Sequence, residues 1–312
     1  EMCIRDSAEA ATLHKEKKSS QAADRLRTAL ERDSENALLH YRLAQYLEAS
    51  EQFDAALAEF VAARDHDPCR YRARSSLRDA AERVAKGHES HGAVFVDLAP
   101  IFEAAAAPKA PGDDHFVEHV HFTIDGHRLV AQSISRAIVE KVRSQTWDEA
   151  RDVNREELAA ELGLLPEDEV AAHALAHFLY QVPPFDRAVD ANRHRDLLEA
   201  KITKLSEPLS DQELLVFAGM DNKSKVDDLV DALGRAYLNK GDAQRAYELF
   251  KKGGRRRPWM PNSFVFEALA LQQLSRKDDA RDALERSRHT PLVGMPVIQQ
   301  LREQVERKLA RP

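Results

Sequence analysis

The sequence predicts a mainly α protein, in which two solenoid-like stacks of helix pairs flank a short α/β segment. The composition favours helices, because hydrophobic residues make up 43% and charged residues 32%, with only 11 Gly and 13 Pro in 312 residues. Apolar residues also recur at helical spacing over most of the chain. Only residues 90–145 depart from this pattern, with a β-branched apolar run and several histidines.

The stretch from residue 230 to 258 has the clearest repeat signature. Gly234 and Ala246 would let two helices cross closely, while Phe250 would fill the space between them. The spacing resembles the tetratricopeptide repeat (TPR), a helix pair of about 34 residues, with Val230 in place of the opening Trp. The resemblance implies concave helical surfaces that bind peptides or proteins. The positions that carry it are Val230, Leu233, Gly234, Tyr237, Gly241, Ala246, Phe250 and Pro258.

Looser copies of this pattern predict two TPR-like stacks, residues 8–89 and 206–312. A helix over residues 70–86, with Leu77, Ala80, Ala81 and Val84 on its apolar stripe, is expected to close the first stack. Pro296 can open a last helix that caps the second stack, although its stripe would also suit a partner helix. The matching positions are Ala22, Leu26, Ala29, His40, Leu43, Ala44, Leu47, Ala56, Phe60, Ala63 and Pro68 in the first stack, Phe264, Ala268, Leu271, Ala280 and Leu284 in the second, and Val297, Ile298, Leu301, Val305 and Leu309 in the cap.

Residues 146–205 are expected to form a helical connector between the segment and the second stack. Asn154 can cap one helix and Pro166 can begin the next. A Pro-Pro break then precedes a third helical stretch over residues 190–205. No chemistry is evident in this connector.

The first seven residues, Glu1-Met2-Cys3-Ile4-Arg5-Asp6-Ser7, are expected to lie outside the fold. The string resembles translated sequencing-adapter sequence at the head of reading frames on short metagenomic contigs. We therefore expect residues 1–7 to be an artefact, and the natural bacterial chain to extend further upstream. The compartment stays open between the cytoplasm and export.

Charge and composition argue against several classes of partner. The net charge is −7 with both signs interspersed, which does not favour nucleic acid. The one basic run, Arg255-Arg256-Arg257, is interpreted as a solvated helix end. No apolar stretch approaches the roughly 20 residues of a membrane span. Cys3 and Cys69 form neither a disulfide framework nor a CxxC metal motif.

Residues 90–145 predict one buried strand followed by one helix. The apolar run at residues 93–98 follows Gly92 and has the composition of a buried parallel strand. A lone strand leaves its backbone groups unpaired, so this run is either an apolar loop or part of a sheet whose other strands lie upstream. Thr123 can cap the following helix. The expected buried face of that helix holds Leu129, Val130, Ile134, Ala137, Ile138 and Val142.

Two residues in the loop before this helix have the spacing of a catalytic pair. In Glu118-x-x-His121 the carboxylate can hold Nδ1 of the imidazole, which leaves Nε2 as a general base. The run from Phe116 to Thr123, with Gly126, resembles the last conserved block of SGNH (GDSL-like) hydrolases, and more narrowly bacterial proteins that join an SGNH domain to TPR repeats. The resemblance implies that His121 is the catalytic base and Glu118 its orienting acid. The implied activity is serine-dependent hydrolysis of ester-linked groups, such as acyl groups on carbohydrate.

The resemblance extends to the flanks, but the chain lacks the remainder of the family pattern. Residues 93–98 match the family's last strand, and Pro183-Pro184-Phe185 resembles the helical region after the domain. The family's nucleophilic Gly-Asp-Ser block and oxyanion Gly and Asn have no counterpart before the repeats. A base without a nucleophile and oxyanion donors cannot perform acyl transfer. We therefore expect this chain to be an inactive C-terminal portion of an SGNH domain joined to TPR stacks.

Other interpretations stay open. His115, His119, His121 and His127 invite a metal, but their spacing matches no standard zinc signature, and no metal or cofactor is predicted. A blander interpretation is that these are ordinary polar residues of a surface loop, and His115, His119 and His127 taken alone are expected to be structural. The alternative function is a non-catalytic TPR scaffold whose concave faces bind peptides or proteins.

Overall fold

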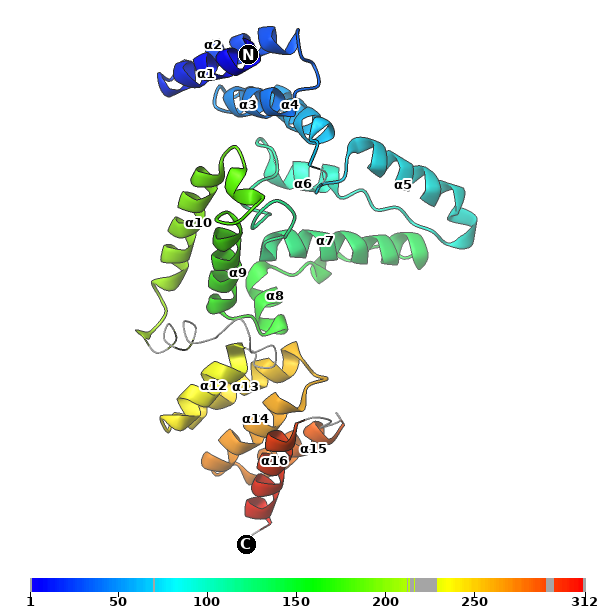
Figure 1. Cartoon of the computed structure of the whole chain (residues 1–312). Coiled ribbons are helices and arrows are strands. Elements are labelled where there is room, and N and C mark those ends of the chain that lie inside the picture. The colour runs from blue at the N-terminus through cyan, green and yellow to red at the C-terminus, as the bar shows by residue number, and fades with distance from the viewer. Residues whose placement is uncertain are drawn as a thin grey trace. The chain divides into compact units, whose positions relative to one another are not determined.

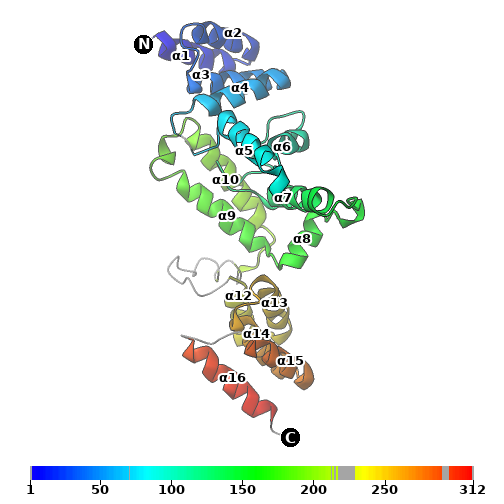
Figure 2. The same ribbon diagram turned by 90° about the vertical axis from the view of Figure 1, so that its right-hand side faces the viewer.

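A computed structural model of the chain describes residues 2–69, 71–211, 213, 216, 229–289 and 295–310. The protein is mainly helical, as the composition predicts (Figures 1 and 2). It divides into two compact units, Glu1–Arg155 and Glu156–Pro312, and each is described by itself. None of the helices in the described ranges combines the length and the apolar character that crossing a membrane requires.

The first unit begins with two helical hairpins that pack on each other. Helix α1 packs on α2, α3 packs on α4, and α2 and α3 join the two hairpins. Leu26, Leu43 and Leu47 are almost fully buried at the centre, which confirms the predicted repeat positions. The helices are α1 (Met2–Lys15), α2 (Ser19–Leu30), α3 (Ala37–Glu48) and α4 (Phe53–His66).

Helix α1 includes residues that the sequence places outside the fold. Asp6 is only 2% exposed. Its carboxylate forms ion pairs of 2.9 Å with Arg25 and 2.9 Å with Arg32. Residues 2–7 therefore contribute to the N-terminal hairpin of this structure.

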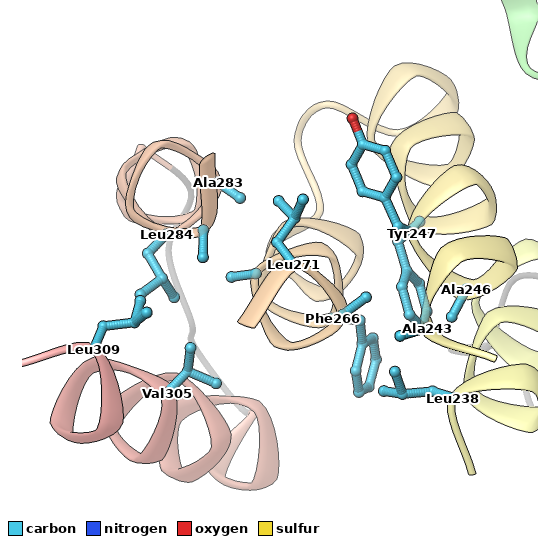
Figure 3. Close-up of a cluster of buried hydrophobic side chains, with 14 of the residues drawn as sticks. Leu238, Ala243, Ala246, Tyr247, Phe266, Leu271, Ala283, Leu284, Val305 and Leu309 are labelled. Atoms are coloured by element: carbon cyan, nitrogen blue, oxygen red, sulfur yellow. The ribbon is translucent and has the colours of Figure 1, made fainter. Parts of the chain in front are cut away.

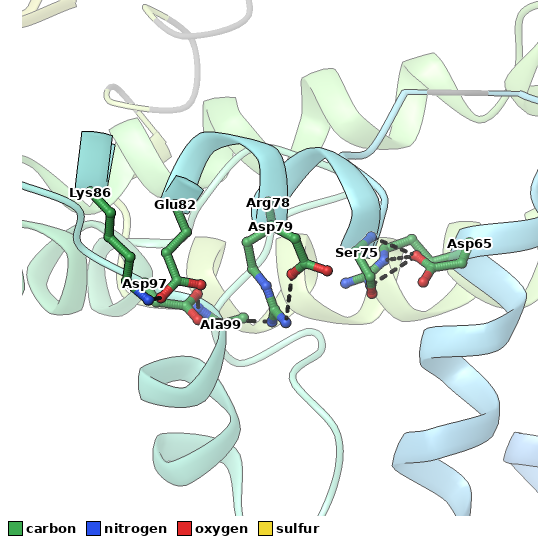
Figure 4. Close-up of polar contacts among 9 residues, drawn as sticks. Asp65, Ser75, Arg78, Asp79, Glu82, Lys86, Asp97 and Ala99 are labelled. Atoms are coloured by element: carbon green, nitrogen blue, oxygen red, sulfur yellow. Dashed lines mark hydrogen bonds and ion pairs between the residues drawn. The ribbon is translucent and has the colours of Figure 1, made fainter. Parts of the chain in front are cut away.

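Helix α5 does not close the first stack. Asp65 accepts a 3.0 Å hydrogen bond from the backbone N–H of Ser75 at the start of this helix (Figure 4). Burial alone would raise the pKa of Asp65, but hydrogen bonds from Ser75 and the neighbouring arginine outweigh it and lower the pKa. No residue of α5 is buried, and Leu77 and Val84 are 61% and 63% exposed. The predicted helix forms, but its predicted packing is wrong, because no described helix covers its apolar stripe. Helix α5 spans Ser75–Gly87.

Residues 93–97 belong to neither a helix nor a strand, and Leu98 already has helical backbone angles as the residue before α6. The run follows the short turn η1 (Glu89–His91) and Gly92, which has a left-handed φ of 85°. Within the described ranges, no backbone group of another segment pairs with residues 93–98 as in a sheet. The one isolated β-bridge of these ranges joins Phe116 and Phe122. The predicted strand is therefore wrong, since a strand needs a neighbour to pair with. Asp97 instead accepts from the backbone N–H of Ala99 at 3.2 Å and so starts α6. Helix α6 spans Ala99–Ala106.

Helix α7 begins where the sequence predicts but buries a different face. Thr123 caps it, because its hydroxyl oxygen accepts from the backbone N–H of Gly126 at 3.2 Å. Among the predicted core residues only Ala137 is buried, whereas Ile134, Ile138 and Val142 are 44%, 43% and 60% exposed. The predicted buried face is wrong there, because no described element packs over that stripe. Helix α7 (Ile124–Ala137) continues into a π-turn, η2 (Ile138–Val142), and η3 (Glu149–Arg151) follows.

The second unit begins with α8 and a hairpin of α9 and α10. Pro166 begins α9, as predicted. Leu165, just before it, is 6% exposed and packs with Leu229 and Leu233 of the following stack. The connector is therefore packed against the repeats at this point. The elements are α8 (Arg155–Leu162), α9 (Pro166–Leu179), η4 (Phe185–Arg187) and α10 (Ala191–Ser206).

The C-terminal stack consists of two hairpins and a cap (Figure 3). Phe250 is fully buried, and a Cβ atom added to Gly234 would lie 2.5 Å from Cε1 of its ring, which confirms the predicted close crossing. Val305 and Leu309 of α16 are buried against α14 and α15, as a capping helix requires, whereas Val297 is 72% exposed. The helices are α12 (Leu229–Asn239), α13 (Ala243–Arg256), α14 (Pro261–Gln273), α15 (Lys277–Arg288) and α16 (Pro296–Leu309).

Candidate functional site

The predicted catalytic pair lies in a tight loop between α6 and α7. Two backbone hydrogen bonds close the loop, from Val117 N–H to His121 O at 2.8 Å and from Thr123 N–H to His115 O at 2.9 Å. The loop is attached to the start of α7 at Gly126, where an added Cβ atom would lie 2.3 Å from the carbonyl oxygen of His115. Only glycine fits there, which accounts for the Gly in this motif.

A cluster of aromatic side chains packs against the loop that carries Glu118 and His121. The Phe102 ring stacks on Phe122 at a centroid distance of 5.4 Å and lies 5.3 Å from the Phe116 ring. His115 is 8% exposed and meets Phe102 edge-on, so it belongs to the buried cluster and not to the surface of the loop. Its Nδ1 atom has no hydrogen-bond partner in the described structure. These contacts hold both ends of the loop in place.

Glu118 and His121 are brought together as the sequence predicts. The Glu118 carboxylate contacts Nδ1 of His121 and also accepts from the backbone N–H groups of His121, at 3.1 Å, and Val120, at 3.3 Å. The Glu118 side chain is 3% exposed, whereas that of His121 is 76% exposed. The geometry therefore fixes one ring nitrogen and leaves Nε2 open to solvent, which suits a general base.

His119, which the sequence does not predict as a site residue, also contacts Glu118. The second carboxylate oxygen of Glu118 contacts Nδ1 of His119, whose ring packs edge-on against Tyr71. The signal was present in the sequence as Glu-His-x-His, which puts two imidazoles within reach of one acid. His127 is apart from this group and packs against Phe122 instead.

The loop lacks the other parts of a hydrolase site. Among the described residues, no hydroxyl or thiol donates a hydrogen bond to Nε2 of His121. Nor do three His, Cys, Asp or Glu side chains of the described ranges form a group arranged to hold a metal ion. The arrangement can orient an imidazole, but no nucleophile of the described residues is hydrogen-bonded to it.

A second candidate site is a groove of about 500 Å³ in the C-terminal stack. Helix α14 supplies its floor, through Phe264 and Leu271. Helices α13 and α15 form its walls, and Tyr247 stands on the α13 side. Arg276 lies over the Tyr247 ring, 4.8 Å from its centroid, and Arg286 lies over Phe264 at 5.0 Å.

The charges of the groove are only partly balanced. Arg276 pairs with Asp279 at 2.7 Å, and Arg286 pairs with Glu267 at 2.9 Å. Lys251 and Arg255 of α13 are exposed, lie one turn apart and have no carboxylate partner among the described residues. Asp282 of α15 also lines the groove and has no cationic partner among those residues.

The three arginines at the end of α13 make different contacts, so the run is not simply a solvated helix end. Arg256 forms a two-pronged ion pair with Asp168 of α9, at 2.7 and 3.0 Å. Arg257 lies 3.3 Å from the buried carboxylate of Asp231. Arg255 is the member of this run that lines the groove, and it has no acid partner among the described residues. This division could not be predicted, because the two acids lie 88 and 26 positions away from their arginines, on other helices.

No protein-family model matches this chain, and no curated protein matches it. Among solved structures, the chain is similar to the TPR2AB-domain:pHSP90-complex of yeast Sti1. The two share 12% sequence identity and a TM-score of 0.24, over 98% of this chain and 98% of that one. At this TM-score the likeness carries no argument about fold or ligand.

Proposed function

We propose that the chain is a non-catalytic scaffold of TPR-like helical hairpins that binds acidic segments of partner proteins. The supporting observation is the pair Lys251 and Arg255 on α13, both exposed and both without a carboxylate partner in the described structure. They line the groove beside the apolar side chains of Tyr247 and Leu271. The groove therefore offers cations and apolar surface to one extended peptide.

The charge balance favours an acidic occupant over a basic one. The groove's other two arginines, Arg276 and Arg286, are neutralised by their own carboxylates. The charges that remain are two cations, Lys251 and Arg255, and one anion, Asp282. An acidic side chain that reaches Lys251 or Arg255 gains an ion pair, whereas a basic one is repelled. Rim cations of this kind affect specificity and association rate more than total affinity.

The test uses the full chain and two fluorescent peptides, one rich in Glu and Leu and the other its Lys-for-Glu counterpart. The double change Lys251→Ala with Arg255→Ala should weaken binding of the acidic peptide about tenfold, because two exposed ion pairs are lost. Asp282→Lys should strengthen it. Fluorescence anisotropy measures both, and the affinity should fall with added salt.

A matched control removes the same charge elsewhere. Arg83→Ala with Lys86→Ala takes two exposed cations from α5 and should leave the affinity unchanged. Equal binding of the acidic and basic peptides, or full binding by the groove variant, would contradict the proposal.

We also propose, as a second function, that residues 90–145 supply the base and its orienting acid to an SGNH-type ester hydrolase. The contact between Glu118 and Nδ1 of His121 favours it, with Nε2 left open. In a longer protein that carries this chain and a Gly-Asp-Ser block, a fluorophosphonate probe should label one serine. His121→Ala should abolish the labelling, and His119→Ala should retain it. Labelling that survives His121→Ala would remove this residue from the mechanism.

A further inference from the structure

We infer, resting on the scaffold function proposed above, that the groove of the C-terminal stack selects acidic segments in which a glutamine or asparagine stands between two acidic residues. The residue that points to this pattern is Glu267 of α14, which lines the groove and is only 3% exposed. Its carboxylate oxygen Oε1 accepts from Arg286 at 2.9 Å. The other oxygen, Oε2, is buried and has no hydrogen-bond partner among the described residues.

The unpartnered oxygen of Glu267 creates a demand for a hydrogen-bond donor. A buried carboxylate oxygen without a donor costs free energy, and Oε2 is too deeply placed for bulk water to supply one. The last torsion of a glutamate side chain is broad, so a small rotation of the carboxylate is enough for Oε2 to meet a group in the groove. A donor on the bound segment would therefore satisfy this oxygen and add to the affinity.

The charges around Glu267 favour a neutral donor over a cation. Arg286 already neutralises the Glu267 carboxylate, and Arg276 lines the same groove. A lysine of the segment that approached Oε2 would be repelled by these guanidinium groups, whereas an amide N–H donates without bringing a charge. Glutamine and asparagine carry such an amide, with two donors each.

The two unpaired cations of α13 set the spacing of the acids. Lys251 and Arg255 are four residues apart on one helix, which places them about 6 Å apart along its axis. In an extended segment, residues i and i+2 project from the same edge and lie about 6.6 Å apart. Two acidic residues separated by one residue therefore match the two cations when the segment runs along α13.

The residue between the two acids faces the other side of the groove. Helix α14 is the floor, and α15 is the wall opposite α13; in Figure 3 the helix that carries Leu271 lies between those that carry Tyr247 and Ala283. Because side chains alternate along an extended segment, the middle residue points away from α13, toward Glu267 and α15. Cations on one side and an unpartnered carboxylate oxygen on the other thus select the order acid, amide, acid.

Fluorescence anisotropy with the full chain tests this pattern on four labelled peptides that share one Leu-containing frame. Their cores are Glu-Gln-Glu, Glu-Met-Glu, Glu-Lys-Glu and Glu-Glu-Gln. The Glu-Gln-Glu peptide should bind about tenfold more tightly than the Glu-Met-Glu peptide, because Met has the length of Gln but no donor for the carboxylate. It should also bind more tightly than the Glu-Lys-Glu peptide and than Glu-Glu-Gln, which has the same composition in another order.

Glu267→Gln is the matched variant of the chain. Its amide oxygen can still accept from Arg286, but its amide nitrogen takes the place of the free acceptor Oε2. The preference for Gln over Met in the peptide should therefore disappear, while the affinity for the Glu-Met-Glu peptide should stay at its parent value. Glu303→Gln makes the same change at an exposed position of α16 outside the groove and should keep the preference. Helical circular dichroism should be equal in both variants.

The outcomes separate this inference from the function on which it rests. If none of the four peptides bound, both the proposed scaffold function and the inference would be overturned. Equal binding of the Gln and Met peptides to the parent chain would overturn the inference alone, and this comparison needs no variant to fold. Tighter binding of the Lys peptide would also overturn it, because an acid of the groove would then hold a cation. So would a preference for Gln that survives Glu267→Gln, because the donor would then be bound elsewhere.

Discussion

The C-terminal stack and the segment from α5 to α7 carry similar apolar stripes, yet only the stack buries them. Phe250 on α13 is fully buried, while Leu77 on α5 is 61% exposed. The difference lies in what faces each side chain. Gly234 leaves room for the Phe250 ring on the neighbouring helix, whereas no described element faces the stripe of α5. An amphipathic pattern thus predicts a helix, but burial needs a second surface of matching shape.

The largest expected effect is the loss of Phe250. Phe250→Ala should destabilise the second unit by about 4 kcal/mol, because it empties a closely packed site. Leu77→Ala on α5 should change stability by less than about 0.5 kcal/mol, because its side chain is exposed. Urea unfolding followed by Trp259 fluorescence in a Trp147→Phe background reports on the second unit, and Trp147 fluorescence in a Trp259→Phe background reports on the first unit. A loss at Leu77 as large as the loss at Phe250 would show that α5 has a packing partner.

Two glycine substitutions test the same comparison, and the expected loss of stability is smaller. Gly234→Ala should lower stability by about 2 kcal/mol, since its methyl group would press on the Phe250 ring. Gly87→Ala at the end of α5 meets nothing within 4 Å and should leave stability unchanged or slightly higher. Thermal unfolding followed by circular dichroism measures both. If Gly234→Ala were neutral, the close crossing of α12 and α13 would not be a source of stability.

The elements that could be predicted are those specified by neighbouring residues. Thr123 caps α7 and Pro166 begins α9, because caps and first-turn prolines act within one helical turn. The TPR spacing also located Phe250, because repeat units define each other's contacts. Glu118 and His121 are three residues apart, so their contact followed from local sequence as well.

What could not be predicted depends on residues far apart in the chain. The run at residues 93–98 has a strand's composition, but strand formation needs a pairing neighbour that the described chain does not offer. The buried face of α7 was wrong for the same reason, as Ile134 shows. The groove lined by α13, α14 and α15 could not be predicted. Glu267, the acid that neutralises Arg286, lies 19 positions away from it in the sequence, on another helix.

The smallest expected effect compares a buried acid with an exposed one. Burial, with the nearby Glu213 and Asp168 carboxylates, raises the pKa of Glu167, whose side-chain oxygen Oε2 has no hydrogen-bond partner in the described structure. On α5, the hydrogen bond and charge of Lys86 lower the pKa of Glu82. The two carboxylates should therefore affect stability in opposite directions as the pH changes.

For Glu167, the folded state binds the proton more tightly than the unfolded state. Its favourable contribution is complete below the ordinary glutamate pKa and is lost as the pH rises through the raised value. Glu167→Gln should therefore raise Tm at neutral pH, and the gain should disappear on acidification. Glu82→Gln should instead lower Tm slightly at neutral pH, a loss that also disappears in acid. Differential scanning calorimetry between acidic and neutral pH measures both. A Glu167→Gln variant that is less stable than the parent at neutral pH would mean that the buried carboxylate has a compensating partner.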